Sequence, residues 1–213
     1  MSDPQEQSLL TSSTNYRTPP KLVLILGGAR SGKSAFAEHL AASSGRRVAF
    51  IATATASDED MRQRIARHRA SRPKDWYTLE EPLDLAAAIK HASTLADVLL
   101  LDCMTLWLAN WLGQQGDINL EQVSSLSNAY TNGMLKDIEE LLAVVADLAP
   151  NKTLIVVSNE VGLGIVPAYP LGLIYRDMLG WVNQRLARTA DRVYLMVAGL
   201  GVDIKRLHEE ASL

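Results

Sequence analysis

Five short runs of the chain are almost wholly apolar, and stretches with helical spacing separate them. Continuous apolarity, without polar alternation, is typical of strands in parallel sheets, because helices cover both of their faces. The runs are LVLIL (22–26), RVAFIAT (47–53), DVLLLD (97–102), TLIVVSN (153–159) and DRVYLMVAG (191–199). This alternation predicts an α/β fold with a mostly parallel sheet flanked by helices, in which ligands bind beyond the carboxyl ends of the strands.

Helical patterns fill the intervals between these runs. Within residues 34–43, for example, Phe36, Ala37, Leu40 and Ala41 share one face. Helices are predicted over 34–43, 58–71, 83–92, 120–148 and 171–189, and another begins within CMTLWLANWL (103–112). Every interval between two predicted strands therefore contains a helix, as crossovers between parallel strands require.

The amino-terminal segment has a different composition from the rest. Residues 1–20 are polar, rich in Ser and Thr, and end in two prolines. They have neither the basic start nor the apolar stretch of a secretory signal. We expect a flexible extension over 1–20 and a single domain over 21–213.

Composition and charge narrow the function classes. A chain of 213 residues with 47% hydrophobic residues can bury one substantial core. Its formal net charge of −3 gives no global positive field for nucleic acid or an anionic membrane surface, and no apolar run reaches the roughly 20 residues of a membrane span. The only cysteine, Cys103, cannot form an internal disulfide. Any anion that this protein binds must therefore be held locally.

A phosphate-binding motif follows the first apolar run directly. It matches G-x-x-x-x-G-K-[ST] and consists of Gly27, Gly28, Ala29, Arg30, Ser31, Gly32, Lys33 and Ser34. In such a loop the backbone N–H groups and the helix N-terminus face the phosphates, Lys33 reaches the β- and γ-phosphates, and Ser34 binds Mg²⁺. We therefore expect a P-loop NTPase-like fold of the RecA-like type.

A carboxylate at the end of another apolar run could complete a magnesium site. VLLLD ends in Asp102, and a P-loop magnesium usually has a second carboxylate partner at the end of a neighbouring strand. Asp102 could instead cap the helix that follows it, and the two roles can coexist. The predicted metal-binding residues are Ser34 and Asp102.

A histidine lies in an arginine-rich helix after the second predicted strand. Ser57–Asp60 reads as a capping box, and Met61, Ile65 and His68 share one face of the helix that it begins. The apolar neighbours of His68 favour a buried, structural histidine. However, the helix begins on the same edge of the sheet as the phosphate loop, and a neutral imidazole is a competent nucleophile towards phosphorus. Both interpretations remain open on spacing alone.

Several motifs in order resemble one family. GGARSGKSxxAE, IAT, EDMRxRIxxHxxxRPxxW, NEVGxGIVP and RDxxGxVNQxLAxxAD, between Leu22 and Lys205, are similar to the bifunctional adenosylcobinamide kinase/adenosylcobinamide-phosphate guanylyltransferase family of cobalamin biosynthesis. The resemblance implies a cytoplasmic bacterial enzyme that phosphorylates the aminopropanol hydroxyl of adenosylcobinamide with ATP or GTP. It then transfers GMP from GTP to the new phosphate, which gives adenosylcobinamide-GDP and pyrophosphate. Related proteins form trimers, so the resemblance also implies a homo-oligomer.

The resemblance also implies roles for individual residues. In the family a histidine on this helix becomes guanylylated, which assigns that role to His68; with Lys33 it makes up the expected catalytic set. Nucleotide-binding positions are implied at the phosphate loop (27–34), at Ala52, Thr53 and Ala54, at Arg69, Ala70, Ser71 and Arg72, and at Glu80 and Asp102. Glu81 could replace Glu80. A carboxylate at this point suits guanine, because it accepts hydrogen bonds from N1–H and the 2-amino group.

Some assignments stay open. The segment 159–167 is expected near the corrinoid or a neighbouring subunit, but an ordinary connection fits it equally well. Trp107 and Trp111 could cover the corrinoid, although core or subunit packing is favoured. Two other functions also remain: a one-step P-loop kinase in which His68 is structural, and a GTP-dependent regulator that modifies no small molecule.

Overall fold

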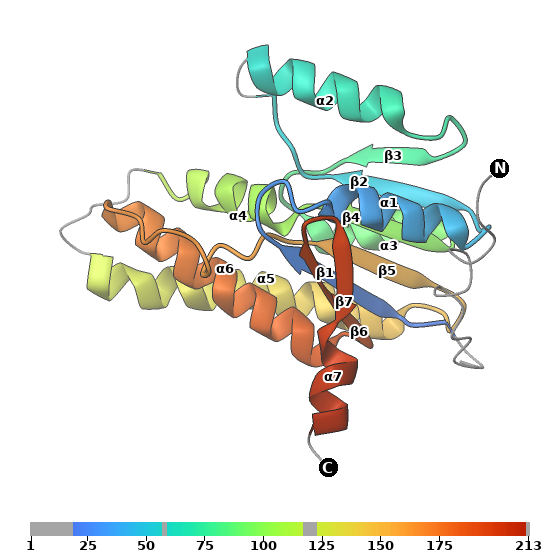
Figure 1. Cartoon of the computed structure of the whole chain (residues 1–213). Coiled ribbons are helices and arrows are strands. Elements are labelled where there is room, and N and C mark those ends of the chain that lie inside the picture. Colours follow the sequence, from blue (N-terminus) through green and yellow to red (C-terminus); the bar gives the residue numbers. More distant parts are fainter. Residues whose placement is uncertain (1–18, 57–58, 117–122, 212–213) are drawn as a thin grey trace.

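One mixed sheet forms the centre of the protein (Figure 1). The structure, a computed structural model, describes residues 19–56, 59–116 and 123–211. In these ranges the strands are β1 (Leu22–Gly27), β2 (Val48–Ala52), β3 (Tyr77–Glu80), β4 (Val98–Asp102), β5 (Thr153–Val157), β6 (Arg192–Val197) and β7 (Leu200–Asp203). Their spatial order is β3-β2-β4-β5-β1-β6-β7.

All neighbouring strands pair in parallel except β6 and β7. β1 lies between β5 and β6, with Leu24 opposite Val156 on one side and Val193 on the other. Parallel pairing brings the carboxyl ends of β1, β2, β4 and β5 to one edge of the sheet. The mostly parallel sheet expected from the apolar runs is confirmed.

Helices cover both faces of this sheet (Figure 1). Those in the described ranges are α1 (Lys33–Ser43), α2 (Glu59–Ser71), α3 (Leu85–Leu95), α4 (Met104–Gly113), α5 (Val123–Asp147), α6 (Pro170–Thr189) and α7 (Ile204–Ala211). Successive residues of a strand point to opposite faces, so Leu22 and Leu24 pack with α3 to α6, whereas Val23 and Ile25 pack with α1. This double burial explains why the strands read as continuous apolar runs.

Three elements escape the hydrophobic pattern. β3 is a half-exposed edge strand of four residues, and its pattern is too short to stand out. The last apolar run, 191–199, ends as a strand at Val197 and turns back through Ala198 and Gly199, which have φ of 52° and 85°. β7 and α7 follow this turn.

The expected capping box falls partly outside the described residues, because residues 57 and 58 are not described and α2 begins at Glu59.

The two tryptophans of α4 belong to the packed interior. Trp107 is 1% exposed, and its indole N–H donates to the Leu83 carbonyl at 2.9 Å. Trp111 is half-buried and donates to the Asp137 carboxylate at 2.6 Å. Core packing, the favoured alternative, is therefore confirmed for Trp107. None of the helices in the described ranges is long and apolar enough to cross a membrane.

Trp107→Ala should lower the free energy of unfolding by about 3–5 kcal/mol, because it opens a large cavity in the core. Trp181, which is 43% exposed on α6, provides a matched control, and Trp181→Ala should cost less than about 1 kcal/mol. Urea unfolding followed by circular dichroism measures both values. Equal losses in the two variants would contradict the described packing of α4.

Candidate functional site

The phosphate loop follows β1, and two of its positions have room and backbone angles for glycine only. Gly27 has φ of 151°, and a Cβ built on it would lie 2.6 Å from the Met196 carbonyl oxygen. Gly32 has φ of 94°, and its Cβ would lie 3.2 Å from the Cα of Gly199. Both glycines of the motif are thus needed for conformation and for close backbone approach. The β6–β7 turn is the surface against which the loop packs.

Lys33 occupies the interior of this loop. Its side chain is largely buried, and Nζ donates to the Gly28 carbonyl at 2.5 Å and to Ser31 Oγ at 3.5 Å. Burial lowers the pKa of Lys33, whereas the negative charge of Asp102 favours its charged form. The ammonium group is therefore held among oxygen acceptors at the point where a phosphate would enter, and phosphate oxygens can replace those acceptors.

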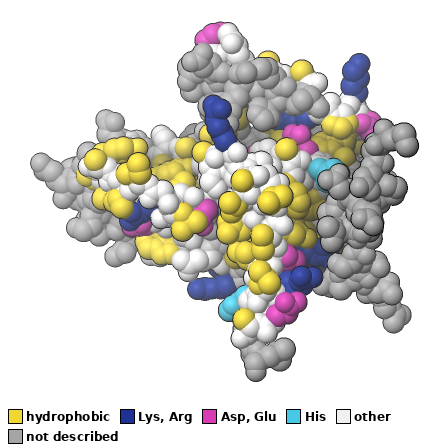
Figure 2. Space-filling view, in the orientation of Figure 1, with side chains coloured by type: hydrophobic (Ala, Val, Ile, Leu, Met, Phe, Trp, Pro, Cys, Tyr) yellow, Lys and Arg dark blue, Asp and Glu magenta, His cyan; other side chains and the backbone are white. Residues whose placement is uncertain are grey.

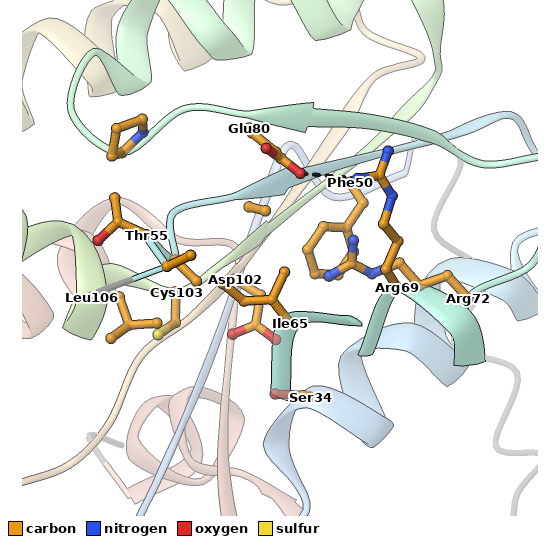
Figure 3. Close-up of a pocket in the computed structure, with 14 residues that line it drawn as sticks. Ser34, Phe50, Thr55, Ile65, Arg69, Arg72, Glu80, Asp102, Cys103 and Leu106 are labelled. Atoms are coloured by element: carbon orange, nitrogen blue, oxygen red, sulfur yellow. Dashed lines mark hydrogen bonds and ion pairs between the residues drawn. The ribbon is translucent and has the colours of Figure 1, made fainter. Parts of the chain in front are cut away.

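A cavity of about 480 Å³ lies between α1, the sheet edge and α2 (Figure 3). Its volume is in the range of small-molecule sites. Predicted residues that line it are Ser34, Ala52, Ala54, Arg69, Arg72, Glu80 and Asp102. Ser34 begins α1, Asp102 ends β4, and Arg69 lies on α2, so the cavity joins the phosphate loop to the arginine-rich helix. We call it the nucleotide pocket.

Other predicted residues do not line this pocket. Thr53 is fully buried, and its hydroxyl both donates to the Cys103 carbonyl and accepts from the Cys103 N–H, each at 2.8 Å. Ala70 is exposed on α2. Both therefore stay predictions as nucleotide contacts, and the hydrogen bonds of Thr53 show a role in joining β2 to the residue after β4.

The side chains of His68 and Ser71 lie outside the described residues, although the α2 backbone that carries them is described. Ile65 lines the nucleotide pocket, and position 68 follows Ile65 by three residues within α2, whereas Arg72 lies just beyond the end of the helix at Ser71. Positions with this spacing share a helix face. By register, position 68 therefore belongs to the face of α2 that meets the pocket.

Asp102 points into the nucleotide pocket towards Ser34 (Figure 3). The position before α4 that would cap the helix is held by Cys103, so helix capping does not occupy Asp102. A serine hydroxyl and a carboxylate are the oxygen donors that Mg²⁺ uses beside substrate phosphates and water. The two predicted metal ligands thus have suitable chemistry and share one pocket.

Cys103 also lines the pocket but is a poor nucleophile. Burial, together with the negative charge of Asp102, raises the pKa of its thiol to about 11. The thiol is therefore protonated near neutral pH, and thiolate chemistry does not contribute here.

Two arginines shape the wall opposite Asp102. The guanidinium carbon of Arg72 lies 3.4 Å from the centroid of the Phe50 ring, and its buried Nε has no hydrogen-bond partner among the residues that the structure describes. Burial lowers the pKa of Arg72, although nearby carboxylates, led by Glu38, oppose the shift. A buried cation with an unsatisfied donor is suited to an anionic ligand. Arg69 forms an exposed ion pair with Glu80 at 3.3 Å.

The structure separates the two candidate guanine carboxylates. Glu80 ends β3 and lines the nucleotide pocket. Glu81 instead accepts from the backbone N–H groups of Leu83 and Asp84 at 2.9 and 3.0 Å, which stabilises the turn before α3. Glu80 is therefore the better placed of the two to meet a base.

Sequence reasoning missed the apolar wall of the pocket. Phe50, Ile65, Pro82, Cys103 and Leu106 line it beside the charged groups. Each lies next to a predicted element or motif, but none carries a signal that separates a pocket wall from a core position. Their contribution appears only when β2, α2 and α4 come together.

The segment 159–167 also starts at this edge. The Glu160 N–H donates to the Gly27 carbonyl at 3.0 Å, which joins the segment to the phosphate loop. Further along, Leu163 and Ile165 are 82% and 97% exposed, and a second, more apolar cavity of about 800 Å³ lies between this segment, α4 and α6. The placement of the segment 159–167 near the corrinoid or a neighbouring subunit remains a prediction.

Comparisons with known proteins give one family. The model of "Cobinamide kinase / cobinamide phosphate guanyltransferase" matches residues 23–204. "Bifunctional adenosylcobalamin biosynthesis protein CobP" of Pseudomonas aeruginosa is 46% identical over 182 residues, which cover 85% of this chain and 96% of the relative. "Bifunctional adenosylcobalamin biosynthesis protein CobU" is 38% identical in Salmonella typhimurium and 39% in Escherichia coli, each over 86% of this chain and 99% of the relative.

Among solved structures, similar chains are far more distant. The RadB recombinase matches with a TM-score of 0.44 and 15% identity over 84% of this chain and 75% of that chain. The P-loop NTPase-like fold rests on the strand order and the phosphate loop of this chain itself.

Gly27→Ala should lower the free energy of unfolding by about 2 kcal/mol or more, because the added Cβ would meet the Met196 carbonyl and φ would be strained. Gly28→Ala is the matched control, since its Cβ meets nothing within 4 Å. Guanidinium unfolding of the two variants measures the difference. If both variants match the unsubstituted protein, the close approach of loop and β6 is refuted.

Proposed function

Because the chain belongs to the cobinamide kinase/cobinamide phosphate guanyltransferase family, we propose that both of the family's reactions use the nucleotide pocket. One observation carries this proposal: a single cavity brings together Ser34 of the phosphate loop, Asp102, and the arginines at the end of α2 and just after it. The substrates are adenosylcobinamide, ATP or GTP for the first reaction, and GTP for the second. The product is adenosylcobinamide-GDP, and pyrophosphate is released.

In the kinase reaction, the phosphate loop binds the triphosphate and leaves the γ-phosphoryl group open to the acceptor. Its backbone N–H groups and Lys33 hold the β- and γ-phosphates. Ser34 and Asp102 would hold Mg²⁺, which supplies charge neutralisation when bound. The aminopropanol hydroxyl of adenosylcobinamide forms a bond to the γ-phosphorus, while the nucleoside diphosphate leaves with the electron pair of the broken bond.

In the guanylyl transfer reaction, a ring nitrogen of His68 forms a bond to the α-phosphorus of GTP, and pyrophosphate leaves towards the phosphate loop. The phosphate of adenosylcobinamide phosphate then attacks the same phosphorus and displaces His68. The register of position 68 on the pocket face of α2 supports this role. Cations close to an imidazole favour its neutral, nucleophilic form.

Arg72 and Glu80 contribute binding rather than bond formation. The unsatisfied Nε of Arg72 provides a donor for a phosphate oxygen, and stacking on Phe50 fixes the plane of the guanidinium. The carboxylate of Glu80 accepts hydrogen bonds from guanine N1–H and the 2-amino group, which adenine cannot provide. GTP selectivity in the second reaction therefore rests on β3.

The covalent step can be tested by labelling. Protein incubated with α-³²P-GTP and Mg²⁺ and then denatured should carry label that is lost in acid and retained in alkali, as a phosphorus–nitrogen bond predicts. His68→Ala should remove the label, whereas His91→Ala, an exposed histidine on α3, should keep it. γ-³²P-GTP should give no label, because the γ-phosphate leaves with pyrophosphate.

Absence of label from the intact protein would favour a one-step kinase. Absence of both products with adenosylcobinamide, ATP and GTP would instead favour a GTP-dependent regulator. Label that persists in His68→Ala would assign the covalent bond to another residue. Adding adenosylcobinamide phosphate should discharge the label before denaturation.

A further inference from the structure

Arg30, at the tip of the phosphate loop, has a backbone conformation that favours glycine. Its φ is 57°, in the left-handed region, where a side chain meets steric hindrance. Elsewhere in the loop the left-handed conformation falls on glycine, as at Gly32. An arginine in this conformation strains the backbone locally. Such strain at a binding loop suggests that the side chain has a function.

The neighbours of Arg30 impose this conformation. The Ser31 N–H donates to the Gly28 carbonyl at 3.3 Å, and the Ser31 carbonyl accepts from the Gly199 N–H at 3.0 Å. Ser31 itself is 8% exposed. Because the β6–β7 turn fixes the residue after Arg30, the loop cannot relax without losing these contacts. Glycine at position 30 would satisfy the same backbone without strain.

The Arg30 side chain is a free cation beside the phosphate site. It is exposed, and within the described ranges no hydrogen bond or ion pair occupies its guanidinium. The arginines across the nucleotide pocket are engaged, since Arg69 pairs with Glu80 and Arg72 stacks on Phe50. Structural roles such as an ion pair or core packing therefore do not explain why arginine stands at this strained position.

Arg30 and Lys33 differ in exposure, because Lys33 is buried and Arg30 is open to solvent. Lys33 lies inside the loop, where the β- and γ-phosphates are bound. Arg30 lies at the outer tip, three residues earlier, on the side open to solvent. A second reactant has to approach the γ-phosphorus from the open side, because the loop encloses the other. From this exposed position the side chain of Arg30 can extend towards a γ-phosphoryl group held by the loop.

We propose that Arg30 is a catalytic residue of the kinase reaction, whose guanidinium contacts the γ-phosphoryl group during its transfer. This inference rests on the proposed use of the loop for that reaction. The acceptor oxygen forms a bond to the γ-phosphorus, the bond to the β-phosphate oxygen breaks, and the hydroxyl proton passes to solvent. Charge spreads over the equatorial oxygens of the moving group, where a planar guanidinium can donate two hydrogen bonds.

The proposal distinguishes the two reactions. Guanylyl transfer occurs at the α-phosphorus, two phosphorus atoms from the γ-phosphoryl group, and on the α2 side of the nucleotide pocket. Arg69 and Arg72 lie there. Loss of the Arg30 side chain should therefore slow the kinase reaction more than the labelling of the protein by α-³²P-GTP.

Arg30→Gly removes the guanidinium and, at the same time, places a residue that favours the left-handed backbone conformation at this position. Its thermal midpoint should equal or exceed that of the unsubstituted protein, because glycine accepts the left-handed conformation. The kcat for transfer of γ-³²P from ATP to adenosylcobinamide should fall about 100-fold or more, with the KM for ATP changed less than about threefold. The rate of labelling by α-³²P-GTP should also be measured. Its fold-reduction should be at least ten times smaller than the fold-reduction in the kcat of the kinase reaction.

Two further variants make the result decisive. Arg30→Asn also tolerates φ above zero and should show the same loss, which separates the side chain from any effect of glycine flexibility. Arg30→Lys keeps the charge without the planar fork and should recover only part of kcat. Gly28→Ala provides the loop control for thermal stability, since its Cβ meets nothing within 4 Å.

The outcomes separate this inference from the proposed function. If Arg30→Gly and Arg30→Asn keep kcat within threefold while Lys33→Ala abolishes the kinase reaction, the inference fails and the proposed function stands. If Lys33→Ala keeps the kinase reaction, the proposed use of the loop fails. A lower thermal midpoint in Arg30→Gly would show that arginine is not strained at this position, which would overturn the inference.

Discussion

Parallel pairing of β2, β4, β5 and β1 brings the ends of four strands to one edge of the sheet, and the polar groups of the nucleotide pocket all depend on that edge. The loop that follows β1 supplies the anion site, β4 ends in Asp102, and β2 leads into α2. The buried strands cannot shift register without disrupting the close packing of their side chains against the helices on both faces. The relative positions of loop, carboxylate and helix are therefore fixed by the core and not by contacts within the site.

The phosphate loop and the nucleotide pocket each hold a cation, Lys33 in the loop and Arg72 in the pocket wall. Lys33 and Arg72 are cations in partly buried positions where water cannot fully solvate them, so burial lowers the pKa of each. The negative charge of Asp102 favours the charged form of both, yet the Nε of Arg72 has no hydrogen-bond partner among the described residues. A triphosphate with Mg²⁺ would satisfy both groups. This arrangement suits phosphoryl and nucleotidyl transfer, in which positioning and charge stabilisation carry most of the catalysis.

Much of this architecture could be predicted from the sequence, for a physical reason. Strands covered on both faces read as apolar runs, and the phosphate loop has a fixed glycine spacing; both signals are local. β3 and β7 escaped because short edge strands carry little apolar signal. The choice of Glu80 over Glu81, the hydrogen bonds of Thr53 and the apolar wall around Phe50 depend on packing between distant segments. The strain at Arg30 is likewise set by the β6–β7 turn, almost 170 residues away.

The central claim is that the phosphate loop and α2 face one nucleotide. A crystal structure with Mg²⁺ and α,β-methylene-GTP, which cannot be cleaved at the α-phosphorus, tests it most directly. We expect the triphosphate between Lys33 and Arg72, the base near Glu80, and a ring nitrogen of His68 in line with the α-phosphorus. A nucleotide held by the loop with its α-phosphorus turned away from α2, and His68 remote from it, would exclude guanylyl transfer through His68 in this pocket.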